Sequence, residues 1–368
     1  MARIVVDAMG GDSAPEEIVR GVALASVGPR PLQLMLVGDE RRISALLAHE
    51  EHDAERIEIF HAPEAIAMDE KPGEAVRRKK RASILVGAEL VAADQGDALV
   101  SAGNTGACVL ACSTKFKKIP GVKKAGLASV YPTEARHGEK DDPFSLILDV
   151  GATVEVEAED LVAFALMGSA YARAISKNPS PKVALLSNGT EPSKGPKAVV
   201  EAFKLLSQHK GIHFIGNVEG IDIPRGTADV VVTNGFVGNV VLKMLEGIGE
   251  TVLELARYAY KEKVVWRMGL YMLSGGIERL KEVTDWEQYG GAPILGFDHL
   301  FIKAHGRSRA RAIRNAILVA AKAVDAKLPT VIQTGLEELK RITQAHAPAA
   351  APAPSVAPPT NPPPEDAG

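Results

Sequence analysis

Short runs of apolar, often β-branched residues recur along this chain, and each leads into a glycine-containing turn followed by a helical pattern. The runs show no alternation of polar and apolar positions, which indicates strands buried on both faces of a sheet. Their alternation with helices is typical of βαβ units. We therefore expect an α/β fold, with a mostly parallel sheet and helices on both faces. The clearest runs are residues 3–7, 32–37, 97–101, 145–149, 182–186 and 228–233.

The segment from residue 251 to residue 281 departs from this pattern. Large apolar and aromatic residues alternate there with lysines and arginines. The spacing predicts a helical hairpin inserted into the α/β fold, with a wide apolar face. Two interpretations remain open: the face is buried in a dimer interface or core, or it forms a basic amphipathic tip on a membrane surface.

The last residues of the sequence, 346–368, are rich in proline and alanine and have no apolar period. Such a segment buries too little apolar surface to offset the entropy of ordering, so we predict disorder. We expect one large α/β domain over residues 1–345, followed by this tail.

Composition narrows the class of protein. The 368 residues are 46% hydrophobic and carry a formal net charge of −3, which argues against a nucleic-acid partner. No window offers the roughly 18 consecutive apolar residues of a membrane span, and we expect a cytoplasmic protein. The two cysteines, Cys108 and Cys112, are four residues apart, and we interpret them as small buried thiols. We expect no metal site.

The turn at residues 102–107 is the clearest candidate for a binding site. Gly103 and Gly106 allow the backbone to turn tightly and approach a ligand, and Asn104 and Thr105 add side-chain donors. A helix begins at Thr105, so unpaired amides and the positive end of the helix dipole face the turn. This arrangement suits phosphate or another anion.

Further candidate residues follow the later strands. Lys194 lies in a glycine-flanked turn that fails the P-loop pattern, yet its ammonium group would neutralise a phosphate. Asn239 and Lys243 are four residues apart and share one helical face. His305 follows a short strand and precedes a glycine, a position suited to proton transfer or phosphate binding.

Two common chemistries lack their signatures. No G-x-G-x-x-G fingerprint follows the first strand, and no G-x-S-x-G elbow is present. Nicotinamide chemistry and serine hydrolysis are therefore disfavoured. We expect no cofactor, and a phosphate held on these turns is better interpreted as a free reactant.

A series of motifs runs in order along the chain: Asp-Ala-Met-Gly-Gly-Asp at 7–12, residues 101–107, Leu-Asp-Val-Gly-Ala at 148–152, residues 216–220, Gly-Phe-Val-Gly-Asn at 235–239 with Lys243, residues 289–293, and Ala-His-Gly at 304–306. Together these motifs resemble the PlsX family of phosphate acyltransferases, which act on acyl-acyl-carrier-protein. The chain departs from the family pattern at Thr153, at Asn234, after Gly296 and in the loop before Lys194, which begins Leu-Ser-Asn-Gly at 186–189 where the family has Asn-Ile-Gly.

The resemblance implies a homodimer whose fold is like that of the isocitrate and isopropylmalate dehydrogenases and of phosphotransacetylase. It implies transfer of a fatty acyl group from acylated acyl carrier protein to inorganic phosphate, giving acyl phosphate for phospholipid synthesis. It also implies peripheral membrane contact, near a downstream glycerol-3-phosphate acyltransferase. Basic stretches at 77–81 and 115–124 would receive an acidic partner.

On this basis Lys194, Asn239 and His305 are the expected catalytic residues, and Gly103, Asn104, Thr105, Gly106 and Lys243 the expected phosphate- or substrate-binding residues. Three alternatives stay open: a short-chain phosphotransacetylase that uses coenzyme A, a variant in which Cys108 carries the acyl group, and a non-enzymatic scaffold that recruits lipid-synthesis enzymes to the membrane.

Overall fold

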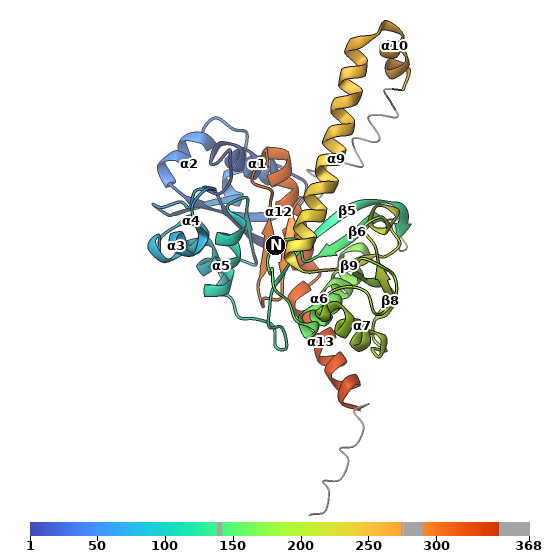
Figure 1. The fold of residues 1–368 in the computed structure, drawn as a ribbon. Coiled ribbons are helices and arrows are strands. Elements are labelled where there is room, and N and C mark those ends of the chain that lie inside the picture. The colour runs from blue at the N-terminus through green and yellow to red at the C-terminus, as the bar shows by residue number, and fades with distance from the viewer. Residues whose placement is uncertain (138–141, 274, 276–289, 346–368) are drawn as a thin grey trace, which may run out of the picture.

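The computed structural model describes residues 1–137, 142–273, 275 and 290–345. These residues form an 11-stranded sheet with helices on both faces (Figure 1). Every predicted strand is present close to its expected bounds, and the mostly parallel α/β fold is confirmed. The expected tail, residues 346–368, lies outside the described residues, and the domain boundary at residue 345 stays a prediction.

The secondary structure alternates between strands and helices for most of the chain. The strands are β1 (Ala2–Asp7), β2 (Leu32–Gly38), β3 (Ile57–His61), β4 (Ala98–Ser101), β5 (Gly126–His137), β6 (Asp142–Leu148), β7 (Lys182–Leu186), β8 (His213–Val218), β9 (Val230–Val232), β10 (Ala292–Leu295) and β11 (Leu300–Lys303). The helices are α1 (Glu16–Ser26), α2 (Glu40–Leu47), α3 (Pro72–Arg78), α4 (Ser83–Ala92), α5 (Thr105–Lys115), α6 (Ala158–Tyr171), α7 (Lys197–Ser207), α8 (Asp222–Arg225), α9 (Gly235–Glu262), α10 (Val264–Met272), α12 (Ala310–Asp325) and α13 (Leu328–Ala345).

The strand order is β3-β2-β1-β4-β11-β10-β5-β6-β9-β7-β8, and it divides the sheet into two parallel groups. The first group, β3 to β11, is parallel throughout, and so is the last group, β6 to β8. Between them β10 and β5 are antiparallel to their neighbours, so the last group runs opposite to the first. The glycine turns therefore do not all lie at one carboxyl edge, as a uniformly parallel sheet would require.

The apolar runs are explained by two cores, one on each face of the sheet. Successive strand residues point to opposite faces. In β1, Ile4 and Val6 belong to the core shared with α1 and α12, whereas Val5 belongs to the core shared with α4. All three side chains are fully buried. At these three positions the strand is covered on both faces, so a polar side chain there would not reach water.

One buried carboxylate, that of Asp149, organises the turn after β6. Its Oδ1 atom accepts hydrogen bonds from the backbone amides of Leu127, Gly151 and Ala152 at 2.8, 2.9 and 2.9 Å. Its Oδ2 atom accepts a hydrogen bond from the Thr153 amide at 2.6 Å. Four amide donors replace the water that burial removes. These bonds join the start of β5 to the end of β6.

The first turn of α9 packs directly against Asp149. Asn234 caps the helix, because its Oδ1 atom accepts a hydrogen bond from the Val237 amide at 2.8 Å. A Cβ atom added to Gly238 would lie only 1.9 Å from the Asp149 carbonyl oxygen, and one added to Gly235 would lie 2.8 Å from the Asp149 Oδ2 atom. The absence of a side chain at both positions sets where α9 meets the sheet.

The predicted hairpin is present as far as the described residues extend, but its first arm does not begin near residue 251. It is the distal part of α9, a continuous helix of 28 residues that projects away from the sheet to α10 (Figure 1). Gly247 and Gly249 lie within α9 and do not end it, since one helical glycine costs only about 1 kcal/mol. Residues 274 and 276–281 of the predicted hairpin lie outside the described residues.

We predict that Gly238→Ala destabilises the protein by about 3 kcal/mol or more, because the new methyl group overlaps the Asp149 carbonyl. Thermal unfolding of the purified variant measures the effect. Gly247→Ala is the matched control, since a Cβ atom there has no neighbour within 4 Å and a helical alanine is favoured over glycine. Equal melting temperatures for the two variants would contradict the role given to this contact.

Candidate active site

A cleft of about 400 Å³ lies where the two groups of strands meet. Its floor is formed by β5 and β10, and its rim by the turn after β11 and the first turns of α5, α9 and α12. The apolar side chains that line it are Met68, Leu127, Val130, Val150, Leu242 and three alanines. The polar and charged side chains that line it are Asp12, Thr105, Ser129, Asn239, Lys243, Glu246, Lys303, His305 and Ser308.

The cleft brings together four of the residues expected from the sequence. Thr105, Asn239, Lys243 and His305 all line it, although they come from three separate parts of the chain. Asn239 projects from the first turn of α9 and lies next to Gly151. Within the described part of the chain its side-chain amide makes no hydrogen bond, so it is available to a ligand.

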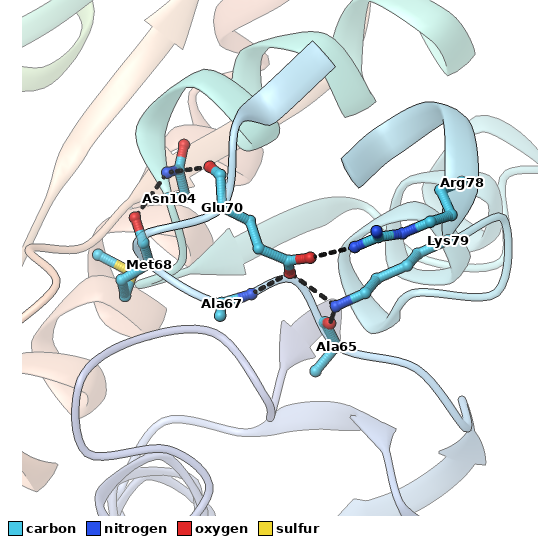
Figure 2. Close-up of polar contacts among 7 residues, drawn as sticks. All are labelled: Ala65, Ala67, Met68, Glu70, Arg78, Lys79 and Asn104. Carbon is cyan, nitrogen blue, oxygen red and sulfur yellow. Dashed lines mark hydrogen bonds and ion pairs between the residues drawn. The ribbon is translucent and has the colours of Figure 1, made fainter. Parts of the chain in front are cut away.

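The remaining residues of the turn that was predicted to bind an anion have a structural role instead. The Asn104 side chain caps α5 by accepting a hydrogen bond from the Ala107 amide at 3.1 Å. Its Nδ2 atom donates to the carbonyl oxygens of Met68 at 2.9 Å and Glu70 at 3.4 Å, as Figure 2 shows. The Asn104 amide is therefore fully used within the protein, and Gly103, Asn104 and Gly106 do not line the cleft.

Asn104 fixes the loop that supplies Met68 to the cleft wall. Glu70 holds the same loop from its other side, because its carboxylate contacts Lys79 Nζ and Arg78 Nη2, each at 2.6 Å (Figure 2). The Lys79 ammonium group lowers the pKa of Glu70. Gly106 allows α3 to approach, since a Cβ atom there would lie 2.7 Å from Pro72 Cγ. The turn thus positions a wall of the cleft.

Lys194 lies away from this cleft. It is exposed on the loop between β7 and α7, and its backbone amide donates to the Glu191 carbonyl at 3.1 Å. The described residues that line the cleft do not include it. Its expected role in binding phosphate stays a prediction.

His305 and Lys243 are in direct contact within the cleft. Lys243 Nζ lies 3.1 Å from His305 Nε2 and 2.8 Å from Glu246 Oε2. Burial and the Lys243 charge lower the pKa of His305 to about 4. The imidazole is therefore neutral near pH 7, and its Nε2 atom accepts a hydrogen bond from the ammonium group. A neutral imidazole is able to take a proton from a bound reactant.

Two further side chains of the cleft were not singled out from the sequence, Lys303 and Ser308. Lys303 ends a strand, where a lysine ordinarily reaches water, and Ser308 follows in a turn. The only signal was their closeness to His305 in a glycine-containing segment. What makes both side chains unusual is their burial. This burial depends on how α5 and α12 pack, so the pattern of apolar and polar residues in the sequence does not predict it.

Cys108 does not fit the role of an acyl-carrying nucleophile. Both cysteines are buried, as expected, and Cys108 does not line the cleft. Burial raises the pKa of the Cys108 thiol to about 11. Since the thiolate is the reactive form, this thiol is inert near neutral pH.

The chain matches known proteins over most of its length. A family described as fatty acid synthesis protein matches residues 2–331. A phosphate acyltransferase of Desulfitobacterium hafniense is 43% identical over 94% of this chain and 99% of its own length. A phosphate acyltransferase of Moorella thermoacetica is 42% identical over 90% of this chain and 94% of its own length.

Within the described part of the chain, no helix combines the length and the apolar character needed to cross a membrane.

Solved structures share the fold at low sequence identity. A phosphotransacetylase from Streptococcus pyogenes superposes with a TM-score of 0.59 and 17% identity over 88% of this chain and 94% of its own. A 4-hydroxythreonine-4-phosphate dehydrogenase from Klebsiella pneumoniae gives a TM-score of 0.50 and 14% identity over 88% and 99%. The expected likeness to phosphotransacetylase and to a dehydrogenase-type α/β fold is confirmed.

We predict that the imidazole of His305 titrates near pH 4 and that Lys243→Met moves this midpoint upward, towards the ordinary value of 6.5. Removal of the neighbouring positive charge makes protonation easier, while burial continues to oppose it. Long-range ¹H–¹⁵N correlation spectra of the imidazole nitrogens measure the titration, and His305→Gln identifies the signal. A wild-type midpoint near 6.5, or no upward shift in the lysine variant, would show that the pair is not coupled.

Proposed function

Because the chain belongs to the fatty acid synthesis protein family, whose relatives here are phosphate acyltransferases, we propose that its cleft transfers a fatty acyl group from acyl carrier protein to inorganic phosphate. The chain is an acyltransferase. The observation that supports this substrate pair is the cleft itself, which joins an apolar floor to a polar end with a free amide, an ammonium group and a neutral imidazole.

The apolar part of the cleft suits an acyl chain. It is lined by Leu127 and Val130 of β5, Val150 of the turn after β6 and Leu242 of α9, and Met68 closes one side. Burying methylene groups against such side chains contributes about 0.8 kcal/mol each. A thioester whose chain lies along this floor places its carbonyl near Asn239 and His305.

The reaction needs positioning rather than a covalent intermediate. An oxygen of HPO₄²⁻ attacks the thioester carbonyl carbon, the new C–O bond forms, and the C–S bond breaks with its electron pair leaving on sulfur. The neutral His305 accepts the phosphate proton and returns it to the thiolate, so acyl phosphate and the free carrier thiol are the products. Asn239 donates to the carbonyl oxygen as negative charge develops there. Holding the two reactants together supplies an effective molarity of roughly 10⁵ M or more.

The alternatives account for fewer features. A coenzyme A-dependent phosphotransacetylase shares the fold, but a short acyl group leaves both the apolar floor and the α10 tip without use. A scaffold without activity leaves unexplained why a neutral histidine and a free amide meet in one cleft.

The carrier protein is proposed to approach along residues 77–81. Arg77, Lys80 and Arg81 are exposed there, while Arg78 and Lys79 pair with Glu70. This basic edge adjoins the loop that places Met68 in the cleft (Figure 2). An acidic carrier steered to this edge would deliver its acyl group to the neighbouring opening.

A second copy of the chain is proposed to pack along α9. Val240, Met244, Ile248, Val252 and Leu255 are each 50–63% exposed. Their spacing of four, four, four and three residues places them on one face of the helix. A continuous apolar stripe of this length is typical of an interface, and it begins one residue after Asn239.

The tip of the hairpin is proposed to bind the membrane surface. Basic residues flank it, and Lys263 Nζ lies 4.6 Å from the centre of the Trp266 ring. Large apolar side chains beside lysine and arginine are typical of helices that lie in the interface of an anionic bilayer. The exposed apolar residues of the tip are Val264, Val265, Trp266, Met268, Tyr271 and Met272.

We predict that Asn239→Ala lowers turnover by about 10²–10³-fold, the usual effect of removing one donor to a developing oxyanion. The assay follows phosphate-dependent loss of the acyl-carrier thioester, with acyl phosphate trapped by hydroxylamine. The control is Gln333→Ala, which removes a side-chain amide from α13 at a position that does not line the cleft. This variant is expected to keep wild-type turnover. Near-normal turnover of a folded Asn239→Ala protein would remove this residue from the mechanism, and no acyl phosphate from wild-type enzyme would refute the proposed function.

We predict that the double variant Val265→Asp/Met268→Asp loses at least about tenfold in partitioning to vesicles of phosphatidylglycerol and phosphatidylcholine, because its apolar face no longer enters the bilayer. Co-flotation measures the partitioning. Val154→Asp/Leu205→Asp adds the same charge at exposed apolar positions outside the hairpin and is the matched control. Equal flotation of the hairpin variant and wild type would contradict membrane binding through this tip.

A further inference from the structure

Two polar side chains that line the cleft are almost completely buried. Lys303, the last residue of β11, is 6% exposed, and Ser308, two residues before α12, is 2% exposed. A single tight turn joins them, in which the Ser308 amide donates to the His305 carbonyl at 3.0 Å. Both side chains line the same cleft as His305 and Lys243.

Neither side chain is satisfied within the described part of the protein. The Ser308 hydroxyl has no hydrogen-bond partner there. The Lys303 ammonium group donates to the carbonyl of its own neighbour, Ala304, and no described carboxylate lies within 4.0 Å of it. A buried cation without a paired anion, and a buried hydroxyl without a partner, are both costly. Both groups line the same cleft, which indicates a ligand that satisfies both.

The acidic groups around Lys303 are engaged elsewhere. Asp7 accepts hydrogen bonds from Ser83 Oγ at 2.6 Å and Ser101 Oγ at 2.7 Å. The Asp12 carboxylate lines the rim of the cleft against Gly306. These two carboxylates act on Lys303 only from a distance, and burial lowers the pKa of its ammonium group. A bound anion would reverse that effect.

Resting on the proposed function, we propose that the Lys303 ammonium group and the Ser308 hydroxyl together bind the inorganic phosphate that attacks the acyl donor. One ammonium and one hydroxyl donor match a small oxyanion, and the neighbouring Lys243 adds a second positive charge. The phosphate then lies beside His305, which accepts its proton, and at the polar end of the apolar floor. This location differs from the turn at 103–106, whose polar side chain is occupied by the protein.

The kinetic test separates phosphate from the acyl donor. Lys303→Met keeps the length of the side chain and removes its charge, and it is expected to raise the KM for phosphate by about 10–100-fold, as for loss of a charged hydrogen bond. Ser308→Ala is expected to raise it by about 3–10-fold, as for a neutral one. The KM for the acyl donor stays unchanged in both. Lys322→Met, an exposed lysine on α12, is the matched control.

A binding test without the acyl donor separates this proposal from the reaction. Inorganic phosphate is expected to raise the melting temperature of wild-type protein and of Lys322→Met, and to raise that of Lys303→Met and Ser308→Ala much less. Ser308→Ala removes an unsatisfied hydroxyl, so it keeps the fold and decides the question if Lys303→Met does not fold.

The outcomes are distinct. Wild-type values of the phosphate KM and of the phosphate-induced shift in Ser308→Ala, or an effect on the donor KM alone, overturn the phosphate site while leaving acyl transfer intact. A wild-type enzyme that forms no acyl phosphate, yet is stabilised by phosphate through Lys303 and Ser308, refutes the proposed reaction and keeps the anion site.

Discussion

The buried carboxylate of Asp149 is the contact on which the architecture of the cleft depends. Four backbone amides, one from β5 and three from the turn after β6, converge on it, and the glycines of α9 pack over it. An isolated buried charge would be prohibitive, so the amides must all be in place for the turn to form. Because α9 is seated on this turn, the position of Asn239 and Lys243 follows from it.

A single helix then connects the chemistry to the surface. α9 begins at the cleft with Asn239, continues as the exposed apolar stripe and ends beside α10 (Figure 1). An ion pair between Arg307 and Glu250 at 2.9 Å also ties the middle of this helix to the turn that contains His305. Through this helix and this turn, Asn239, Lys243 and His305 are held on adjoining parts of the cleft.

The chemistry of the cleft rests on groups that the protein leaves incompletely satisfied. The imidazole of His305 is kept neutral by burial and by an adjacent ammonium group. Among the described residues, the buried Ser308 hydroxyl has no hydrogen-bond partner, and the buried Lys303 ammonium group bonds only the Ala304 carbonyl, with no carboxylate within 4.0 Å. Asn104, by contrast, is fully hydrogen-bonded and acts as a brace for the Met68 loop (Figure 2). A polar side chain whose hydrogen bonds are all made within the protein has a structural role, whereas one left without partners is the better candidate for binding a ligand.

Local pattern alone determined the strands, the α/β class and the hairpin, because burial on both faces requires continuous apolar runs such as Ile4 to Val6. It also placed Thr105, Asn239, Lys243 and His305 after strand ends. The reversal of strand direction at β10 and β6 was decided only by tertiary structure, since an apolar run reads alike in parallel and antiparallel pairs. Tertiary structure also decided that Lys194 is exposed away from the cleft and that Lys303 is buried within it. Lys194 lies in the loop after β7 and Lys303 is the last residue of β11, and a glycine lies close to each in the sequence. The helices that pack around each lysine decide which one is buried, and such contacts join residues distant in sequence.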